Sequence, residues 1–138
     1  MNHRIAILSD IHGDTTALEA VIADARALGA TEYWLLGDIL LPGPGREDIF
    51  ELLDAIPITA AVRGNWDDCV LEALDGEYGL EDPQEIQMLR LTQYLMEGLD
   101  PKRIDWLRSL PLVEKKEVNG IRFSLTHNLP EKNYGGDL

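Results

Sequence analysis

The stretch that decides the fold is residues 5–13, which read IAILSDIHG. Its first four residues form a continuous apolar run, which predicts a strand buried on both faces of a parallel sheet. Two polar residues, Asp10 and His12, follow directly after this strand. Apolar residues then recur with a helical period as far as Gly29, which predicts that a helix follows the strand and its loop.

The same pattern of an apolar run followed by polar residues occurs twice more. Residues 33–36 and 58–62 each predict a buried strand. The first of these runs into Asp38, and the second runs into a predicted polar loop at 63–68. Alternating strands and helices indicate an α/β fold with a parallel sheet, whose ligand sites gather at the carboxyl ends of the strands.

Several helix starts are marked by their capping residues. Thr16 and Glu19 have the spacing of a capping box for the first helix, and residues 49–53 carry the apolar positions of a second. Asp82-Pro83 and Asp100-Pro101 each place an N-cap acid before a proline. We therefore predict two further helices that form an insertion or lid over one edge of the sheet.

A hairpin is predicted near the end of the chain. Asn119 and Gly120 separate two strand-like runs, and this pair is the strongest short hairpin signal. Alternating apolar residues at 121–125 form the second strand, which ends at Thr126 and His127. A fourth strand therefore also leads into a potential metal ligand.

Composition narrows the classes of protein. The 138 residues are enough for one domain, 1–138, and 45% of them are hydrophobic, as in a globular protein. A net charge of −13 argues against duplex nucleic acid as a partner. We expect no membrane partner, because no segment approaches spanning length. Cys69 is the single cysteine, which suggests a reducing cytoplasm.

Five residues that follow predicted strands could bind metal. They are Asp10, His12, Asp38, Asn65 and His127. Each fragment alone is typical of an ordinary capped turn or a hydrogen-bonded histidine, but together they predict a metal site. Carboxylates mixed with imidazoles favour divalent manganese, iron or zinc over magnesium or calcium. Asp38, in the middle of the set, is the best candidate to bridge two such ions.

Four motifs resemble those of a known family: Asp10-x-His12-Gly13, Gly37-Asp38, Gly64-Asn65 and Thr126-His127. They look like the successive signature motifs of calcineurin-like metallophosphoesterases, and the resemblance covers essentially the whole chain. Residues 34–38 and 127–133 are most similar to a bacterial phosphodiesterase branch that includes asymmetric dinucleoside-tetraphosphate hydrolases. The resemblance implies a metallophosphoesterase-like β-sandwich flanked by helices, incomplete at the C-terminus.

The resemblance also implies roles for single residues. Asp10, His12 and Asp38 would bind one ion, and Asp38, Asn65 and His127 the other. The enzyme would hydrolyse phosphodiesters or nucleotide phosphoanhydrides by means of a hydroxide that bridges the two metals, with a small phosphorylated molecule such as a nucleotide as substrate.

Arg63 is predicted to join Asp38 and Asn65 in catalysis by binding a phosphate oxygen, and the alternative is a salt bridge.

Two features depart from the family pattern. No Gly-His-x-His motif occurs before Leu138, so each ion lacks one implied ligand. The alternative function is therefore a catalytically impaired fragment with an exposed apolar edge, which could form a homo-oligomer. In addition, Trp66 stands where many relatives carry a histidine that acts as a general acid and protonates the leaving group. An indole cannot do this. This favours leaving groups that depart as anions. Trp66 itself could pack in the core or stack on a nucleobase.

Overall fold

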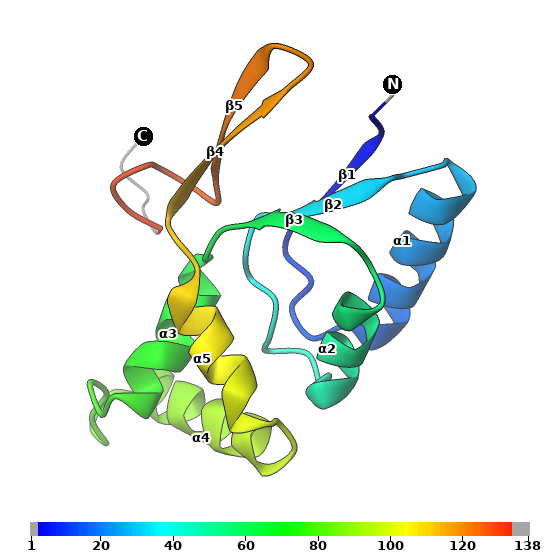
Figure 1. Ribbon diagram of the computed structural model, residues 1–138. Helices are drawn as coiled ribbons and strands as arrows, with labels where there is room; N and C mark the ends of the chain where they lie inside the picture. Colours follow the sequence, from blue (N-terminus) through cyan, green and yellow to red (C-terminus); the bar gives the residue numbers. More distant parts are fainter. Residues whose placement is uncertain (1–2, 134–138) are drawn as a thin grey trace.

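The computed structural model describes residues 3–133. Strands and helices alternate in the first half, three helices follow, and a hairpin comes last (Figure 1). In chain order the elements are β1 (Ile5–Leu8), α1 (Thr15–Ala27), β2 (Glu32–Leu35), α2 (Glu47–Asp54), β3 (Ile58–Ala61), α3 (Asn65–Leu74), α4 (Pro83–Glu97), α5 (Pro101–Ser109), β4 (Val113–Val118) and β5 (Ile121–Thr126).

The first three strands form a parallel sheet in the order β1-β2-β3. Leu8 lies opposite Leu35, and Leu35 lies opposite Ala61, so the carboxyl ends of the three strands are level with one another. The loops that follow these strands therefore emerge at the same edge of the sheet. This is the parallel arrangement predicted from the sequence.

The two faces of the sheet are covered by different partners. In β2, Tyr33 and Leu35 pack into the main core with α1 and α2, whereas Trp34 points to the opposite face. There its ring meets the edge of Phe123 from the hairpin, with centroids 5.3 Å apart. The β4-β5 hairpin thus forms a second layer of strands, and the predicted β-sandwich with flanking helices is confirmed (Figure 1).

The start of α1 differs from the prediction. Its N-cap is Asp14, whose carboxylate accepts a hydrogen bond from the backbone N of Ala17 at 2.9 Å. The predicted capping box of Thr16 and Glu19 is therefore wrong, because the helix begins one residue before Thr16. The caps of the two later helices are confirmed: Asp82 and Asp100 both accept from backbone N–H groups in their first turns.

The predicted loop at 63–68 is also wrong for most of its length, since α3 begins at Asn65. Gly64 is the extended N-cap, and the Asp67 carboxylate accepts from the backbone N of Gly64 at 2.8 Å. An acid at the third helical position stabilises a helix start. The turn that carries Asn65 is therefore helical.

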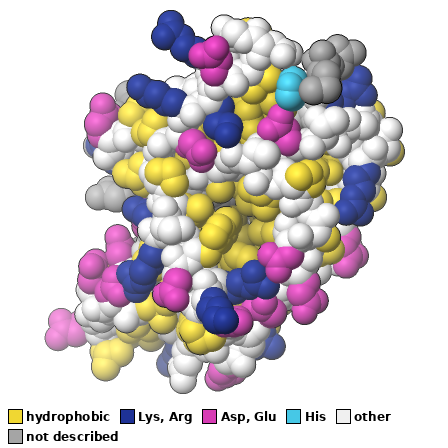
Figure 2. Space-filling model, in the orientation of Figure 1, with side chains coloured by type: hydrophobic (Ala, Val, Ile, Leu, Met, Phe, Trp, Pro, Cys, Tyr) yellow, Lys and Arg dark blue, Asp and Glu magenta, His cyan; other side chains and the backbone are white. Residues whose placement is uncertain are grey.

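The helical part packs against α2 through a charged contact. Arg103 of α5 lies over the Phe50 ring and forms ion pairs with Glu47 and Asp54 of α2, each at 2.8 Å. Figure 2 shows hydrophobic side chains gathered in a hollow at the centre of one face, with acidic and basic side chains around it. Among residues 3–133, no helix combines the length and apolar character needed to cross a membrane.

An apolar edge of the sheet is exposed. Among the described residues, β1 pairs with β2 and has no strand on its other side. Ile7 of β1 is 55% exposed, and Val21 of the neighbouring helix α1 is 44% exposed. This exposed apolar edge belongs to the parallel sheet, whereas the predicted edge concerned the second layer of strands.

Candidate metal centre

The loops after β2 and β3 cross in close contact at the carboxyl edge of the sheet. Gly37 has a φ of +90°, and a Cβ atom at this position would overlap the backbone of Gly64. A Cβ atom on Gly64 would in turn overlap the side chain of Asp38. Glycine is required at both positions, because any side chain would separate Asp38 from the start of α3.

Three ligand groups meet beside this crossing. Asp10 follows β1, His12 lies two residues later, and Asp38 follows β2. Their potential ligand atoms all lie within 4.8 Å of one another. The Nε2 atom of His12 is 3.3 Å from an Asp10 oxygen and 3.5 Å from Oδ2 of Asp38. The sequence separation between these groups is bridged by the parallel sheet.

A second imidazole approaches Asp38 from the hairpin. The Nε2 atom of His127 lies 3.4 Å from Oδ2 of Asp38 and 2.9 Å from Oδ1 of Asn65. The same Asp38 oxygen therefore lies between the two histidines. The structure thus brings together at one rim all five residues that the sequence nominates as ligands.

Backbone carbonyls fix the orientation of both imidazoles. Nδ1 of His12 is 2.7 Å from the carbonyl oxygen of Leu41, and Nδ1 of His127 is 2.6 Å from that of Leu36. A carbonyl only accepts, so Nδ1 carries the proton in each neutral ring and Nε2 keeps its lone pair. In His127 this lone pair faces an amide oxygen. The Nε2 lone pair and the amide oxygen of Asn65 repel each other, and a cation bound by both would relieve this repulsion.

The carboxylate of Asp38 is the buried acidic group among the candidate ligands. The residue is 2% exposed, and this burial raises the pKa of its carboxyl. A hydrogen bond of 2.9 Å from the backbone N of Trp66 and the nearby histidines act in the opposite direction. A bound cation would also favour the ionised form.

Strained backbone is concentrated at the same residues. Asp10, His12 and Asp38 have φ values of +58°, +50° and +56°, in the left-handed region. For residues with a side chain this region costs roughly 1–2 kcal/mol each. Such strain is typical of functional sites, where the surrounding contacts hold it in place.

Asp67 connects the loop that follows β2 to the loop that follows β3. It is fully buried, and its carboxylate accepts hydrogen bonds from the backbone N of Asp38, Ile39 and Gly64 at 2.8, 3.1 and 2.8 Å. Burial nevertheless raises the pKa of Asp67 to about 6. An acid three residues after Gly64 predicts a helix start, but this spacing gives no sign of the contact with the loop that carries Asp38.

Arg63 is bound within a structural network. Its Nε donates to Asp68, and its Nη1 donates to the carbonyl of Leu110 at 3.0 Å. Asp68 also accepts from Nδ2 of Asn133 at 2.9 Å. Of the two roles considered for Arg63, the ion pair is present, and these contacts occupy two of the nitrogens that could bind a phosphate oxygen.

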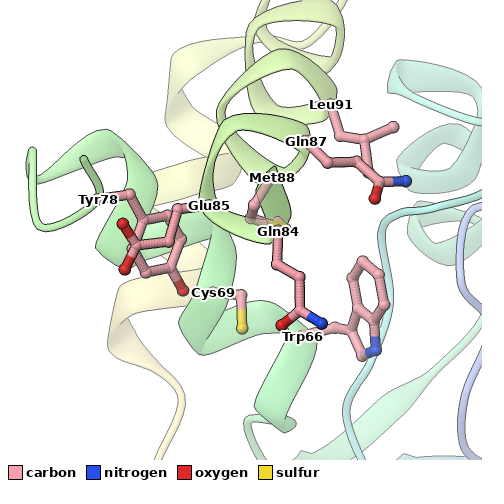
Figure 3. Close-up of a pocket in the computed structure, with 8 residues that line it drawn as sticks. All are labelled: Trp66, Cys69, Tyr78, Gln84, Glu85, Gln87, Met88 and Leu91. Atoms are coloured by element: carbon pink, nitrogen blue, oxygen red, sulfur yellow. The ribbon is translucent and has the colours of Figure 1, made fainter. Parts of the chain in front are cut away.

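Trp66 lies between the ligand cluster and a hollow. Its half-buried ring meets His12 edge-on, with centroids 5.7 Å apart and an interplanar angle of 83°. The same ring lines a hollow of about 400 Å³ between α3 and α4 (Figure 3). Trp66 thus connects the polar cluster to a space on the helical side.

Comparisons with known proteins identify a family and related folds. The sequence pattern of the calcineurin-like phosphoesterase family matches residues 3–136. The uncharacterized protein MJ0912 of Methanocaldococcus jannaschii is 30% identical over 131 residues, which cover 92% of this chain and 50% of that protein.

Two solved structures are also similar. A metallophosphoesterase from Sphaerobacter thermophilus has a TM-score of 0.60 and 31% identity, with 83% of this chain and 44% of that chain covered. The hypothetical protein PH1004 from Pyrococcus horikoshii OT3 has a TM-score of 0.71 at 20% identity, over 97% and 58% of the two chains, and shows a likeness of fold. This chain spans about half the length of these relatives.

Proposed function

Because this chain belongs to the calcineurin-like phosphoesterase family, we propose that it hydrolyses phosphodiesters or nucleotide phosphoanhydrides, including those of dinucleoside tetraphosphates, with two divalent transition-metal ions. The observation that carries the proposal is the cluster of Asp10, His12 and Asp38, whose ligand atoms lie within 4.8 Å of one another. Carboxylate and imidazole donors in one cluster suit manganese, iron or zinc.

The two proposed ion sites share Asp38. Asp10, His12 and Asp38 would hold one ion, and Asp38, Asn65 and His127 would hold the other. This assignment is supported by the position of Asp38 Oδ2 between the two Nε2 atoms, at 3.5 and 3.4 Å. When bound, such ions supply positive charge for the phosphate oxygens and make water nucleophilic at neutral pH.

The protein's own groups prepare this site before any ligand binds. The carbonyls of Leu36 and Leu41 keep both Nε2 lone pairs directed at the cluster, and Asp67 holds the two loops together. Binding therefore needs little rearrangement of the ligands, which strengthens electrostatic stabilisation of the reacting phosphate.

Trp66, which lies beside His12, restricts which leaving groups can depart easily. The Trp66 ring contacts the His12 ring, and an indole N–H donates a hydrogen bond but does not release its proton. A missing general acid typically costs about 10²- to 10⁴-fold in rate. We therefore expect phosphates with nucleotide or aryl leaving groups, which depart as stable anions, to be better substrates than alkyl phosphates.

Hydrolysis of bis(p-nitrophenyl) phosphate with added Mn²⁺, together with the metal content of the purified protein, tests the proposal. Asp38→Asn should bind less Mn²⁺ and lose more than about 100-fold in activity, because the shared ligand loses its charge. Asp105→Asn, an exposed acid on α5, is the matched control and should retain both properties.

The alternative function is a chain that keeps the fold but binds metal weakly. The observation that favours it is that, within the described residues, Asp10, His12 and Asp38 are the one group of three or more histidine, cysteine or acidic side chains whose potential ligand atoms lie within 4.8 Å of one another. Water can replace an absent imidazole at lower affinity. Absence of both metal and turnover in the wild-type protein would favour this alternative.

A further inference from the structure

The hollow between α3 and α4 is built from flat and apolar surfaces with polar groups at its border. Trp66 contributes its ring from α3, and Met88 and Leu91 contribute from α4. Figure 3 shows the Trp66 ring across an open space from Leu91, and the side chains of Gln84 and Gln87 both extend from α4. A volume of about 400 Å³ lies within the range of small-molecule sites.

The hollow adjoins the metal centre through one residue. Trp66 lines the hollow with its side chain, meets the His12 ring at 5.7 Å, and donates from its backbone N to Asp38. A ligand that stacked on Trp66 would therefore lie one aromatic ring away from the cluster. This proximity suits a molecule that joins a planar group to a phosphate.

Among the polar groups that line the hollow, the Glu85 carboxylate already has a hydrogen-bond partner, whereas two carboxamides do not. The Glu85 carboxylate accepts from the backbone N of Gly79, and Glu72 nearby accepts from the hydroxyl of Tyr78. In contrast, the carboxamides of Gln84 and Gln87 make no hydrogen bond within residues 3–133. A carboxamide both donates and accepts, as the edge of a nucleobase does.

We propose that this hollow binds the heteroaromatic base of a nucleotide whose phosphate lies at the cluster of Asp10, His12 and Asp38. The base stacks on Trp66, and Gln84 and Gln87 bind its edge. The position of the phosphate rests on the proposed function, whereas the base site rests on the hollow itself.

The larger hollow on the other side of the cluster suits such a base less well. It lies between the start of α1 and the loop at 42–44, along the edge of β1 that has no partner strand within residues 3–133. Its apolar walls include Ile7 and Val21, and the aromatic ring in its lining is the His12 imidazole, which belongs to the cluster itself. The α3-α4 hollow offers both the ring and the free carboxamides.

The experiment measures binding of adenosine and of ribose 5-phosphate to the full, metal-free chain by NMR titration. Adenosine should bind and should shift the indole signal of Trp66, whereas ribose 5-phosphate should not. Trp66→Ala should weaken adenosine binding about 10-fold or more, as expected for the loss of one stacked base. Gln87→Ala should weaken it about 2- to 10-fold, as expected for one hydrogen bond.

Two controls test whether adenosine binds in this hollow. Gln93→Ala changes an exposed glutamine of the same helix that does not line the hollow, and it should leave adenosine affinity unchanged. Adenosine should also slow the alkylation of Cys69, which lines the hollow and is the single cysteine of the chain. This second measurement uses the wild-type protein and does not depend on whether a variant folds.

The outcomes separate this inference from the proposed function. Adenosine binding without Mn²⁺-dependent hydrolysis would support the base site and refute the activity. Hydrolysis without adenosine binding, or binding that Trp66→Ala and Gln87→Ala leave unchanged, would overturn the inference. Equal affinity for hexyl phosphate and adenosine 5′-monophosphate would also overturn it, because the hollow would then be a general apolar site. With Mn²⁺ present, the monophosphate should bind more tightly than adenosine, and Asp38→Asn should remove that gain.

Discussion

Asp67 shows how one buried side chain can organise a site without serving as a ligand. Its carboxylate binds the backbone of the loop that carries Asp38 and the backbone of Gly64, which precedes Asn65. Because the residue is fully buried, no solvent can replace these bonds when the side chain is changed. The positions of Asp38 and Asn65 thus depend on a residue outside the ligand set.

We predict that Asp67→Asn destabilises the fold and weakens the metal centre. One amide oxygen cannot accept all three backbone hydrogen bonds, and each buried N–H left unsatisfied costs about 1–3 kcal/mol. Urea unfolding should show this loss, and calorimetry should show Mn²⁺ affinity about 10- to 100-fold lower. Asp105→Asn, an exposed acid on α5, is the control. An unchanged Mn²⁺ affinity in Asp67→Asn would contradict the prediction.

At the residue scale, the sequence could predict that the candidate ligands lie together but could not predict the contacts that support them. Asp10, His12 and Asp38 each follow an apolar run, so the parallel sheet is enough to bring them together. The carbonyls of Leu36 and Leu41 carry no such signal, because any residue has a carbonyl and its direction depends on the loop. Asp67 was recognisable as a helix-start acid, and its second contact depends on how two loops cross.

The elements beside the site are joined by a short polar bridge. The Thr15 hydroxyl, in the first turn of α1, donates to the Asp48 carboxylate of α2 at 2.7 Å. Asp48 also accepts from the backbone N of Arg46 at 2.7 Å. These hydrogen bonds, the Thr15 bond first, lower the pKa of Asp48. The bridge ties the start of α1 to α2 behind the metal centre.

This shift predicts a pH dependence for Asp48→Ala. Since the folded pKa is below the ordinary value of 3.8, the ionised Asp48 stabilises the fold above pH 3.8, and this contribution is lost as the pH falls through the folded pKa. The substitution should cost about 1 kcal/mol at pH 7 and progressively less below pH 3.8. Denaturant unfolding over this range measures the difference, with the exposed Glu51→Ala of the same helix as control. A cost that stayed constant down to pH 2 would refute the role of the ionised group.

The hairpin that carries His127 depends on its turn. Asn119 and Gly120 both have positive φ, at +51° and +78°, and nothing lies within 4 Å of a Cβ atom built on Gly120. Gly120→Ala should therefore cost roughly 1–2 kcal/mol through backbone strain alone. Asn119→Gly, which retains access to positive φ, should have little effect. Thermal unfolding followed by circular dichroism compares them, and equal melting temperatures would show that the turn is unstrained.

At the element scale, the sequence predicted the type of most elements better than it predicted their ends. The prolines after Asp82 and Asp100 fixed two helix starts, because proline is tolerated in the first turn and cannot donate. For α1, both Asp14 and Thr16 had capping chemistry, and the loop geometry selected Asp14. For α3, the glycine at 64 looked like part of a loop, although it is the extended residue from which the helix begins.

The whole molecule combines strong negative charge with one apolar edge. The formal net charge is −13, and β1 exposes Ile7 beside an unpaired edge in the described part of the sheet. Charge keeps chains apart in solution, whereas an open strand edge favours pairing with another chain. Salt screens the first effect and leaves the second in place.

We therefore predict that the chain associates into homo-oligomers through β1 and that salt strengthens this association. Ile7→Lys should shift the protein towards monomer, because a charged side chain on an edge strand opposes pairing. Ile121→Lys changes another exposed isoleucine, on the hairpin, and should leave the association intact. Light scattering during size-exclusion chromatography measures the mass. A clean wild-type monomer at high concentration would contradict the prediction.

The carbonyls that orient the two histidines have a mechanical consequence. Leu36 and Leu41 lie on either side of Asp38 in one short segment, and each carbonyl grips a different imidazole. A shift of this segment should therefore move both rings together with the Asp38 carboxylate that lies between them. The segment at 36–41 thus sets the spacing of the two imidazoles and the Asp38 carboxylate. A distortion elsewhere in the molecule should move these three groups together before it changes the distances between them.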